Sequence, residues 1–449
     1  MLPFTANLEP AQGVMLFAVI YCTGTYGGAI TAILFNIPGA PENAPTAFDG
    51  YPMTRKGQSG KAVGAAVLCS AIGGVTSAIV MMAATEPLAN WAISNIGPPE
   101  IFALVFFGLA VASSVGGRTL WKGWMSVLLG LLIATIGQDP VGGINRYNFG
   151  FSDLAAGIAF VPAILGFFAV SEIFVQAEKK AIGMYEAPKL SLDFPTILEL
   201  WTQKIAVVRS ILVGFFCGIL PGIGATLAAF MGYGEAVRWS KNKESFGKGN
   251  LEGVISSETA NNAATGAAMI PLLALGLPGG ALTAMMVAVF QMHDLEPGPM
   301  VFYNSPDLIW IVFAAMFYAN VSILFIGLLE TKTILHLLKI PFQFLAPMIL
   351  LLASIGSYIG RGQVLDVIVM FISGIMGFLL RRSGYSIPGI VLGIILGKIG
   401  EQNFAQGMQM VHYDLLEYFS RPICLLLIIA GSLTILTGVY KALSFSIKS

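Results

Sequence analysis

The chain of 449 residues is 56% hydrophobic and 11% charged, with a mean hydropathy of +0.79. Soluble domains carry about 25% charged residues, so this composition excludes a water-soluble globular protein and predicts a surface that mostly faces lipid. Basic and acidic residues number 24 each, a balance that argues against a partner such as nucleic acid.

Apolar stretches recur along the whole chain. A membrane helix needs about 20 mostly apolar residues. Several of the candidate spans are shorter than that or lie next to each other, so their total is firmer than their boundaries. The candidates are 14–36, 62–88, 101–119, 121–137, 154–175, 205–232, 253–277, 307–330, 340–358, 364–380, 386–399 and 421–443. We therefore expect an all-α polytopic membrane protein with about 11–12 membrane segments, embedded in a lipid bilayer.

The first span runs into a proline–glycine pair. A glycine-led apolar stretch, residues 27–36, leads to Pro38 and Gly39, and Thr46 follows. Proline removes a backbone donor and glycine weakens a helix, so we expect the helix to break there. The next connector, 53–61, carries three basic residues, which is typical of a cytoplasmic loop.

Span 205–232 is interrupted near its middle. Pro221 lies among three glycines, Gly218, Gly222 and Gly224, and basic residues flank the span on both sides. Because clusters of lysine and arginine mark cytoplasmic loops, both ends of this span are predicted to face the cytoplasm. We therefore expect a re-entrant hairpin that turns at Pro221–Gly224.

The first break has a counterpart 240 residues further along the chain. Pro278 and Gly279 follow another glycine-led apolar stretch, 266–276, and Thr283 comes just after them. The match around the two pairs is loose, but the order of features is the same. This recurrence predicts a diverged duplication.

The charges of the connectors predict the orientation of the two copies. The connector after the second copy, 293–304, carries Asp294 and Glu296 and no lysine or arginine, whereas the connector after the first is basic. Equivalent loops of opposite charge bias are expected on opposite sides of the membrane, which is an inverted-topology repeat. We expect a first membrane repeat at 1–175, a cytoplasmic linker at 176–204, a second repeat at 205–420 and a C-terminal helix at 421–449.

The two predicted repeats differ at their beginnings. A hairpin precedes the second copy, whereas the first copy begins almost at Met1. We expect that the sequence is truncated or its start misassigned. Loss of the first hairpin is the alternative.

The two helix breaks are the candidate substrate site. Inverted-repeat transporters hold their substrate near mid-membrane with broken helices, whose free N–H groups and positive N-terminal ends suit carboxylates. Thr46 and Thr283 lie near the starts of the helices after the breaks, and unwound carbonyls near Asn36 and Gly276 could hold a cation. The alternative is that both proline–glycine pairs end helices at the membrane surface.

Polar residues also enter the span before the second break. Asn261 and Asn262 are amides at a depth where unpaired polar groups are costly, so we expect them at the site. The alternative is that they cap helix ends or join helices. Glu258 is either a residue that couples transport to a cation or a solvated residue at a helix start, and the sequence leaves both open.

The sequence contains no recognisable catalytic or metal-binding set. The cysteines are scattered singly in apolar runs, which predicts buried apolar residues. Asp139, Pro140 and Arg146 are expected to form a polar turn between spans. The candidate substrate-binding residues are Asn36, Pro38, Gly39, Thr46, Pro221, Gly222, Gly224, Asn261, Asn262, Pro278, Gly279 and Thr283. The ion-coupling candidates are Glu258 and Gly276.

Taken together, these motifs resemble the TctA family, the large transmembrane subunit of the tripartite tricarboxylate transporters. The resemblance covers nearly the whole chain. The matching residues are 26–28 through 36–39, 46–52, 137–143 with Arg146 and 149–150, 218–224, 252–254 through 258–263, 277–279 and 297–299.

This resemblance implies a carrier in the bacterial cytoplasmic membrane that is driven by an ion gradient, of Na⁺ or H⁺, and needs no cofactor. It also implies three kinds of partner: a small four-helix membrane subunit, a periplasmic solute-binding protein, and a carboxylate substrate such as a citrate-like tricarboxylate. An intramembrane enzyme would need a catalytic set at depth, and a channel would be expected to show a filter element. Neither is visible, so both remain the weaker alternatives.

Overall fold

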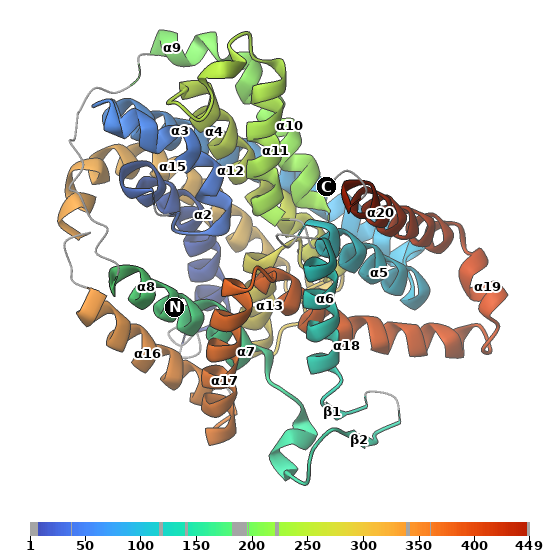
Figure 1. Ribbon diagram of the computed structural model, residues 1–449. Coiled ribbons are helices and arrows are strands. Elements are labelled where there is room, and N and C mark those ends of the chain that lie inside the picture. Colours follow the sequence, from blue (N-terminus) through green and yellow to red (C-terminus); the bar gives the residue numbers. More distant parts are fainter. Residues whose placement is uncertain are drawn as a thin grey trace.

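The computed structural model describes residues 8–36, 38–115, 120–139, 142–181, 195, 197–220, 224–337, 342–359 and 361–446. Helices make up most of this part of the chain (Figure 1). Five are long and apolar enough to cross a membrane, at Pro10–Phe35, Ser59–Asn95, Phe160–Glu178, Pro306–Gly327 and Val364–Arg382. Shorter apolar helices add further membrane-suited segments, so the prediction of an all-α membrane protein is confirmed.

The first half of the chain forms a helical series that is interrupted once by a small hairpin. The elements are α2 (Pro10–Phe35), η1 (Pro41–Asn43), α3 (Ala44–Arg55), α4 (Ser59–Asn95), α5 (Pro98–Val115), α6 (Leu120–Ala134), β1 (Gly137–Gln138), β2 (Asn145–Arg146), η2 (Ser152–Ala156), α7 (Phe160–Ile164), η3 (Leu165–Val170) and α8 (Ser171–Ala181). Strands β1 and β2 pair antiparallel and project beyond the end of α6 (Figure 1). The η3 segment is a π-helical turn inside an otherwise continuous α7–α8 helix.

The second half repeats this helical character. Its elements are α9 (Ile197–Thr202), α10 (Lys204–Ile219), α11 (Gly224–Trp239), η4 (Lys243–Ser245), α12 (Leu251–Leu275), α13 (Ala281–Met292), α14 (Val301–Asn304), α15 (Pro306–Leu337), α16 (Phe342–Ile359), α17 (Val364–Arg382), α18 (Ile387–Met410), α19 (Leu415–Ser420) and α20 (Pro422–Ser446). Of the expected linker 176–204, residues 182–194 and 196 lie outside the described part.

Helix α12 is the core of the molecule. Every residue from Gly253 to Ala274 is buried, and the helix packs against α4, α10 and α11 (Figure 1). Small residues allow these helices to approach closely, as is common in membranes. A Cβ added at Gly73 of α4 would lie 2.5 Å from the Thr259 carbonyl oxygen, and one at Gly214 of α10 would lie 2.2 Å from that of Ala260.

Helices of the two halves also pack against each other. Helix α12 of the second half packs on α4 and α3 of the first, while α2 of the first packs on α15 and α13 of the second. In the same manner α6 packs on α18, and α17 packs on α7, η3 and α8. The helices before the two proline–glycine pairs end at Phe35 and Leu275, which are 240 residues apart. The inverted orientation of the halves in a membrane stays a prediction.

Helices α10 and α11 form the predicted hairpin in part. They pack against each other and against α12, with four residues between them. The turn residues Pro221, Gly222 and Ile223 lie outside the described residues, and the re-entrant position of the hairpin in a membrane stays a prediction.

Candidate substrate cavity and adjoining polar cluster

A cavity of about 810 Å³ lies where several helices of both halves begin or end. The first proline–glycine segment contributes Pro38–Glu42. The start of α11 contributes Gly224–Thr226, the start of α13 contributes Gly280, Leu282 and Thr283, and the start of α18 contributes Ser386–Gly389. The π-helical turn η3 contributes Phe167, Phe168 and Ala169 to the lining. Such turns occur often at functional sites.

Three helices start at this cavity, and two of them have local capping. The Gly280 N–H donates to the Thr283 hydroxyl at 2.8 Å at the start of α13. The Ser386 hydroxyl accepts from the Gly389 N–H at 3.2 Å at the start of α18. The start of α11, at Gly224, lies against α13, because a Cβ on Gly224 would be 3.1 Å from the Gly280 Cα. The first turns of α11, α13 and α18 therefore bring three positive helix ends to one space.

Both proline–glycine pairs lie between helices, as the sequence predicts. Asn36 and Gly276 end α2 and α12 in the left-handed conformation, with φ of 56° and 74°. Each N–H donates to a carbonyl four residues earlier, a common way to end a helix. After the first break the chain folds back on α2, and the Gly39 N–H donates to the Gly28 carbonyl at 3.2 Å.

Close backbone approach explains the two glycines of the breaks. A Cβ on Gly39 would lie 2.5 Å from the Gly28 Cα, and one on Gly279 would lie 2.9 Å from the Gly218 carbonyl oxygen of α10 and 2.8 Å from the Ala268 Cβ. Gly28 and Ala268 are themselves 240 residues apart. The two breaks are thus folded back in the same way on the helices that precede them.

Charged residues of both signs line the cavity. Arg381, at the end of α17, is the sole lysine or arginine in the described lining, and its guanidinium pairs with the carboxylate of Glu172 on α8. Glu42, on η1, is 5% exposed, and the Thr226 hydroxyl of α11 lies 3.4 Å from its carboxylate.

Next to this cavity lies a buried polar group that we name the Glu258 cluster, consisting of Asn43, Thr46, Ser70, Ser257, Glu258 and Asn262. It joins η1, α3, α4 and α12. The Thr46 hydroxyl donates to Glu258 Oε1 at 2.5 Å, and the Ser70 hydroxyl donates to Oε2 at 3.0 Å. The Asn262 amide donates to the Ser70 hydroxyl at 2.8 Å and lies 3.4 Å from Glu258 Oε2. All six residues are fully buried.

Several amide atoms in this region lack a hydrogen-bond partner among the described residues. They are the Oδ1 atoms of Asn43 and Asn262 and both side-chain polar atoms of Asn261. Buried polar atoms are nearly always paired with protein or water, and unpaired ones need a specific reason. Here the unpaired amides flank a buried carboxylate, a pattern that fits a site where a small polar species binds.

The predicted site residues fall into four groups. Those that line the cavity are Pro38, Gly39, Gly224 and Thr283. Those in the adjoining cluster are Thr46, Glu258 and Asn262. The structure does not place Asn36, Asn261, Gly276, Pro278 or Gly279 in the lining. Pro221 and Gly222 lie outside the described residues.

The structure decides one of the alternatives left open by the sequence and bears on another. Glu258 is fully buried at the eighth position of α12, so the alternative of a solvated residue at a helix start is wrong. Asn262 joins α12 to Ser70 of α4, which agrees with the alternative that this amide connects helices. Asn261 has no such partner among the described residues.

Sequence reasoning missed Glu42, Arg381 and the start of α18. Glu42 lies between two apolar stretches, where an ionisable residue is a signal by itself. Pro388 and Gly389 are another proline–glycine pair, preceded by the helix-capping Ser386, but no repeat spacing pointed to them. Arg381 follows an apolar stretch, and nothing else in the sequence pointed to it.

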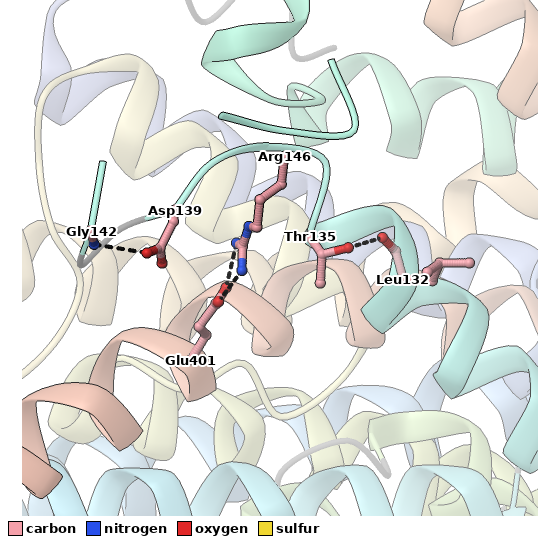
Figure 2. A network of polar contacts seen from close by, with 6 residues as sticks. All are labelled: Leu132, Thr135, Asp139, Gly142, Arg146 and Glu401. Carbon is pink, nitrogen blue, oxygen red and sulfur yellow. Dashed lines mark hydrogen bonds and ion pairs between the residues drawn. The ribbon is translucent and has the colours of Figure 1, made fainter. Parts of the chain in front are cut away.

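The polar turn expected at Asp139 and Arg146 contributes no residue to the described lining of the cavity, and an ion pair joins it to α18 (Figure 2). Arg146 forms two hydrogen bonds with the carboxylate of Glu401 on α18, at 2.5 and 3.0 Å, and these bonds raise its pKa above the ordinary value. Asp139 accepts from the Gly142 N–H at 2.7 Å. The β1–β2 hairpin is thereby fastened to α18. All four cysteines are free and buried, as predicted.

Comparison with known proteins decides the family. The profile described as the tripartite tricarboxylate transporter TctA family matches residues 1–392. The chain belongs to the TctA family. This TctA member is therefore a tricarboxylate transporter subunit rather than an enzyme, and it works with partner subunits in a membrane.

Two curated relatives of this TctA member come from Agrobacterium vitis. An uncharacterized 52.8 kDa protein in the TAR-I ttuC' 3' region is 35% identical over 456 residues, covering 100% of this chain and 88% of the relative. An uncharacterized protein in the TAR-II ttuC' 3' region is 36% identical over 236 residues, covering 53% of this chain and 96% of the relative. No solved structure matches the chain.

Proposed function

We propose that this chain is the translocating subunit of an importer of small carboxylates in the bacterial cytoplasmic membrane, driven by a gradient of Na⁺ or H⁺. A periplasmic solute-binding protein delivers the substrate, and a small four-helix membrane subunit completes the complex. The observation that carries the proposal is the cavity of about 810 Å³ at which α11, α13 and α18 begin.

The cavity suits a small anion in size and in charge. Its volume lies within the roughly 300–1,000 Å³ range of small-molecule sites. Helix N-terminal ends present free N–H groups and positive dipole ends, which favour carboxylates. Arg381 supplies a full positive charge, and its planar guanidinium can bind a carboxylate through two hydrogen bonds. The substrate then contacts Pro38, Gly39, Gly224 and Thr283.

An inverted-repeat mechanism supports the same proposal. The helices before the two breaks end 240 residues apart, their left-handed ends correspond at the same offset, and the halves exchange helix contacts. In such transporters the halves move around a site at their interface, exposing it alternately to each side. Lining residues come from both halves, so relative motion of the halves would open and close the cavity.

Coupling to an ion is assigned to the Glu258 cluster behind the cavity. The remaining candidates Asn261, Pro278 and Gly279 act on the structure around the site: Pro278 and Gly279 shape the second break, and Asn261 offers unpaired polar atoms. Gly276 and Asn36 set the helix ends from which the breaks begin.

The test is uptake of radiolabelled carboxylates into proteoliposomes that contain this chain and its membrane partner, with the binding protein outside. We expect accumulation that requires an ion gradient and the binding protein, and competition that ranks carboxylates above their amides and esters. Uptake that persists without any gradient would contradict a carrier. Failure of all carboxylates to bind or compete would contradict the anion site.

A further inference from the structure

We propose that Glu258 carries the proton that drives transport, and that the Glu258 cluster is the proton site of the carrier. This inference deepens the proposed function and rests on it. It names the coupling ion and the residue that holds it, which neither the family nor the cavity decides.

The burial of Glu258 gives the first argument. The side chain is fully buried in the most enclosed helix of the protein, and no ion pair among the described residues includes it. An ionised carboxylate without a positive partner is strongly disfavoured in such a place. A bound proton removes that charge, so occupancy by a proton stabilises this arrangement of α3, α4 and α12.

The contact distances give the second argument, which favours a proton over a metal cation. The Thr46 and Ser70 hydroxyls lie 2.5 and 3.0 Å from the two carboxylate oxygens, so they are in direct hydrogen-bond contact. The hydroxyls of Thr46 and Ser257 lie 3.0 Å from each other. An alkali cation that took these hydroxyls as ligands would have to separate the oxygens, whereas a proton binds without moving them. A protonated carboxyl can also donate to a hydroxyl oxygen, since hydroxyls both accept and donate.

The position of the cluster provides a route for coupling to the cavity. Thr46 lies on α3, the helix that follows the first proline–glycine break. Glu42 lies on η1, between the first break and α3, and lines the cavity. Loss of the proton would place a charge on Glu258 and change its hydrogen bond with Thr46 on α3. These changes would bias the position of the break segment on which the substrate rests.

Other titratable groups surround the cluster on the elements packed against α12. They are Glu42 on η1, Asp49 on α3, Cys69 on α4, Arg209 on α10, Tyr233 on α11, and Tyr21 and Cys22 on α2. Asp49 is held by the Tyr233 hydroxyl and by backbone N–H groups, and Arg209 pairs with Glu252. None of these contacts supplies a cation to Glu258.

The experiment compares the unmodified carrier with Glu258→Gln in proteoliposomes containing the membrane partner. Glutamine has the shape of a protonated glutamate and cannot release the proton. In the unmodified carrier, an acidic exterior should drive accumulation of the labelled carboxylate, and a pH dye inside should report proton entry. Glu258→Gln should lose accumulation and proton entry but keep exchange of labelled for unlabelled substrate. Glu86→Gln, the same change on an exposed part of α4, is the matched control and should behave like the unmodified carrier.

Ser70→Ala keeps the carboxylate and removes one hydroxyl donor, so it tests the site without neutralising it. We expect the pH of half-maximal uptake to move upward, because a carboxylate that loses a donor holds its proton more tightly. An unchanged pH profile would contradict the proposal. Full proton-driven accumulation by Glu258→Gln would also contradict it. A Glu258→Gln variant that lost both exchange and accumulation would contradict it as well.

Uptake by the unmodified carrier that follows a Na⁺ gradient at equal pH, without proton entry, would overturn the proton site while leaving the proposed function intact. Absence of any gradient-dependent uptake by the unmodified carrier would instead overturn the proposed function.

Discussion

Arg381 lines the cavity and also forms an ion pair with Glu172 from the other half of the chain. Both side chains are partly exposed, and such ion pairs contribute roughly 0–1 kcal/mol to stability. A substrate carboxylate can therefore replace Glu172 at little structural cost. Competition between the two carboxylates for one guanidinium would link substrate binding to contact between α8 and α17.

We expect Arg381→Gln to raise the KM for carboxylates about 10–100-fold, because a hydrogen bond to a charged group contributes about 1.5–3 kcal/mol. The effect should be larger for tricarboxylates than for monocarboxylates, and protein yield and thermal unfolding in detergent should change little. Initial rates of proteoliposome uptake over a substrate series measure this. The adjacent Arg382→Gln is a matched control, since Arg382 pairs with Glu178 and does not line the cavity. Equal KM changes in both variants would remove Arg381 from the site.

At the scale of single elements, the two breaks shape the cavity by ending α2 and α12. Proline and glycine in the sequence were enough to predict that α2 and α12 end before Pro38 and Pro278, since the physical cause is local. The start of α18 at Pro388 also lines the cavity, but that outcome depends on packing between distant helices. The partners of Glu258 come from α3 and α4, about 190–210 residues earlier in the chain. No pattern in one sequence shows such contacts.

Gly279 tests whether the second break needs close contact with the α10–α11 hairpin. We expect Gly279→Ala to lower stability by about 1–3 kcal/mol and to reduce uptake, because the added Cβ would meet the Gly218 carbonyl and Ala268. Thermal unfolding in detergent and initial uptake rates measure the two effects. Gly234→Ala on α11 is the control, because a Cβ there meets nothing within 4 Å. A fully stable and active Gly279→Ala would show that the contact is dispensable.

At the scale of the whole molecule, the exchange of contacts between halves turns two separate breaks into one cavity. Neither half contains the complete site, since the lining draws on the first break, α11, α13 and α18 together. The 240-residue spacing made it possible to predict two related breaks. It did not reveal that Glu42 would lie between the cavity and Glu258, because that requires the packing of η1 against α11 and α12.

Alternating access depends on the opposite orientation of the two halves in the membrane. Labelling of single cysteines tests this orientation. Lys56 lies in the basic connector after the first break, and Arg238 is one of the basic residues that follow span 205–232. Both should face the cytoplasm, whereas Glu296 should face the periplasm. All three side chains are exposed, and the four native cysteines are buried, so background labelling should be low.

A membrane-impermeant maleimide added to intact cells should modify Glu296→Cys and leave Lys56→Cys and Arg238→Cys unmodified until the membrane is permeabilised. This pattern would place the loops after the two breaks on opposite sides of the bilayer. Labelling of Lys56→Cys but not Glu296→Cys in intact cells would reverse the predicted orientation. Labelling of both would put the two loops on one side, and the halves could not then be inverted copies.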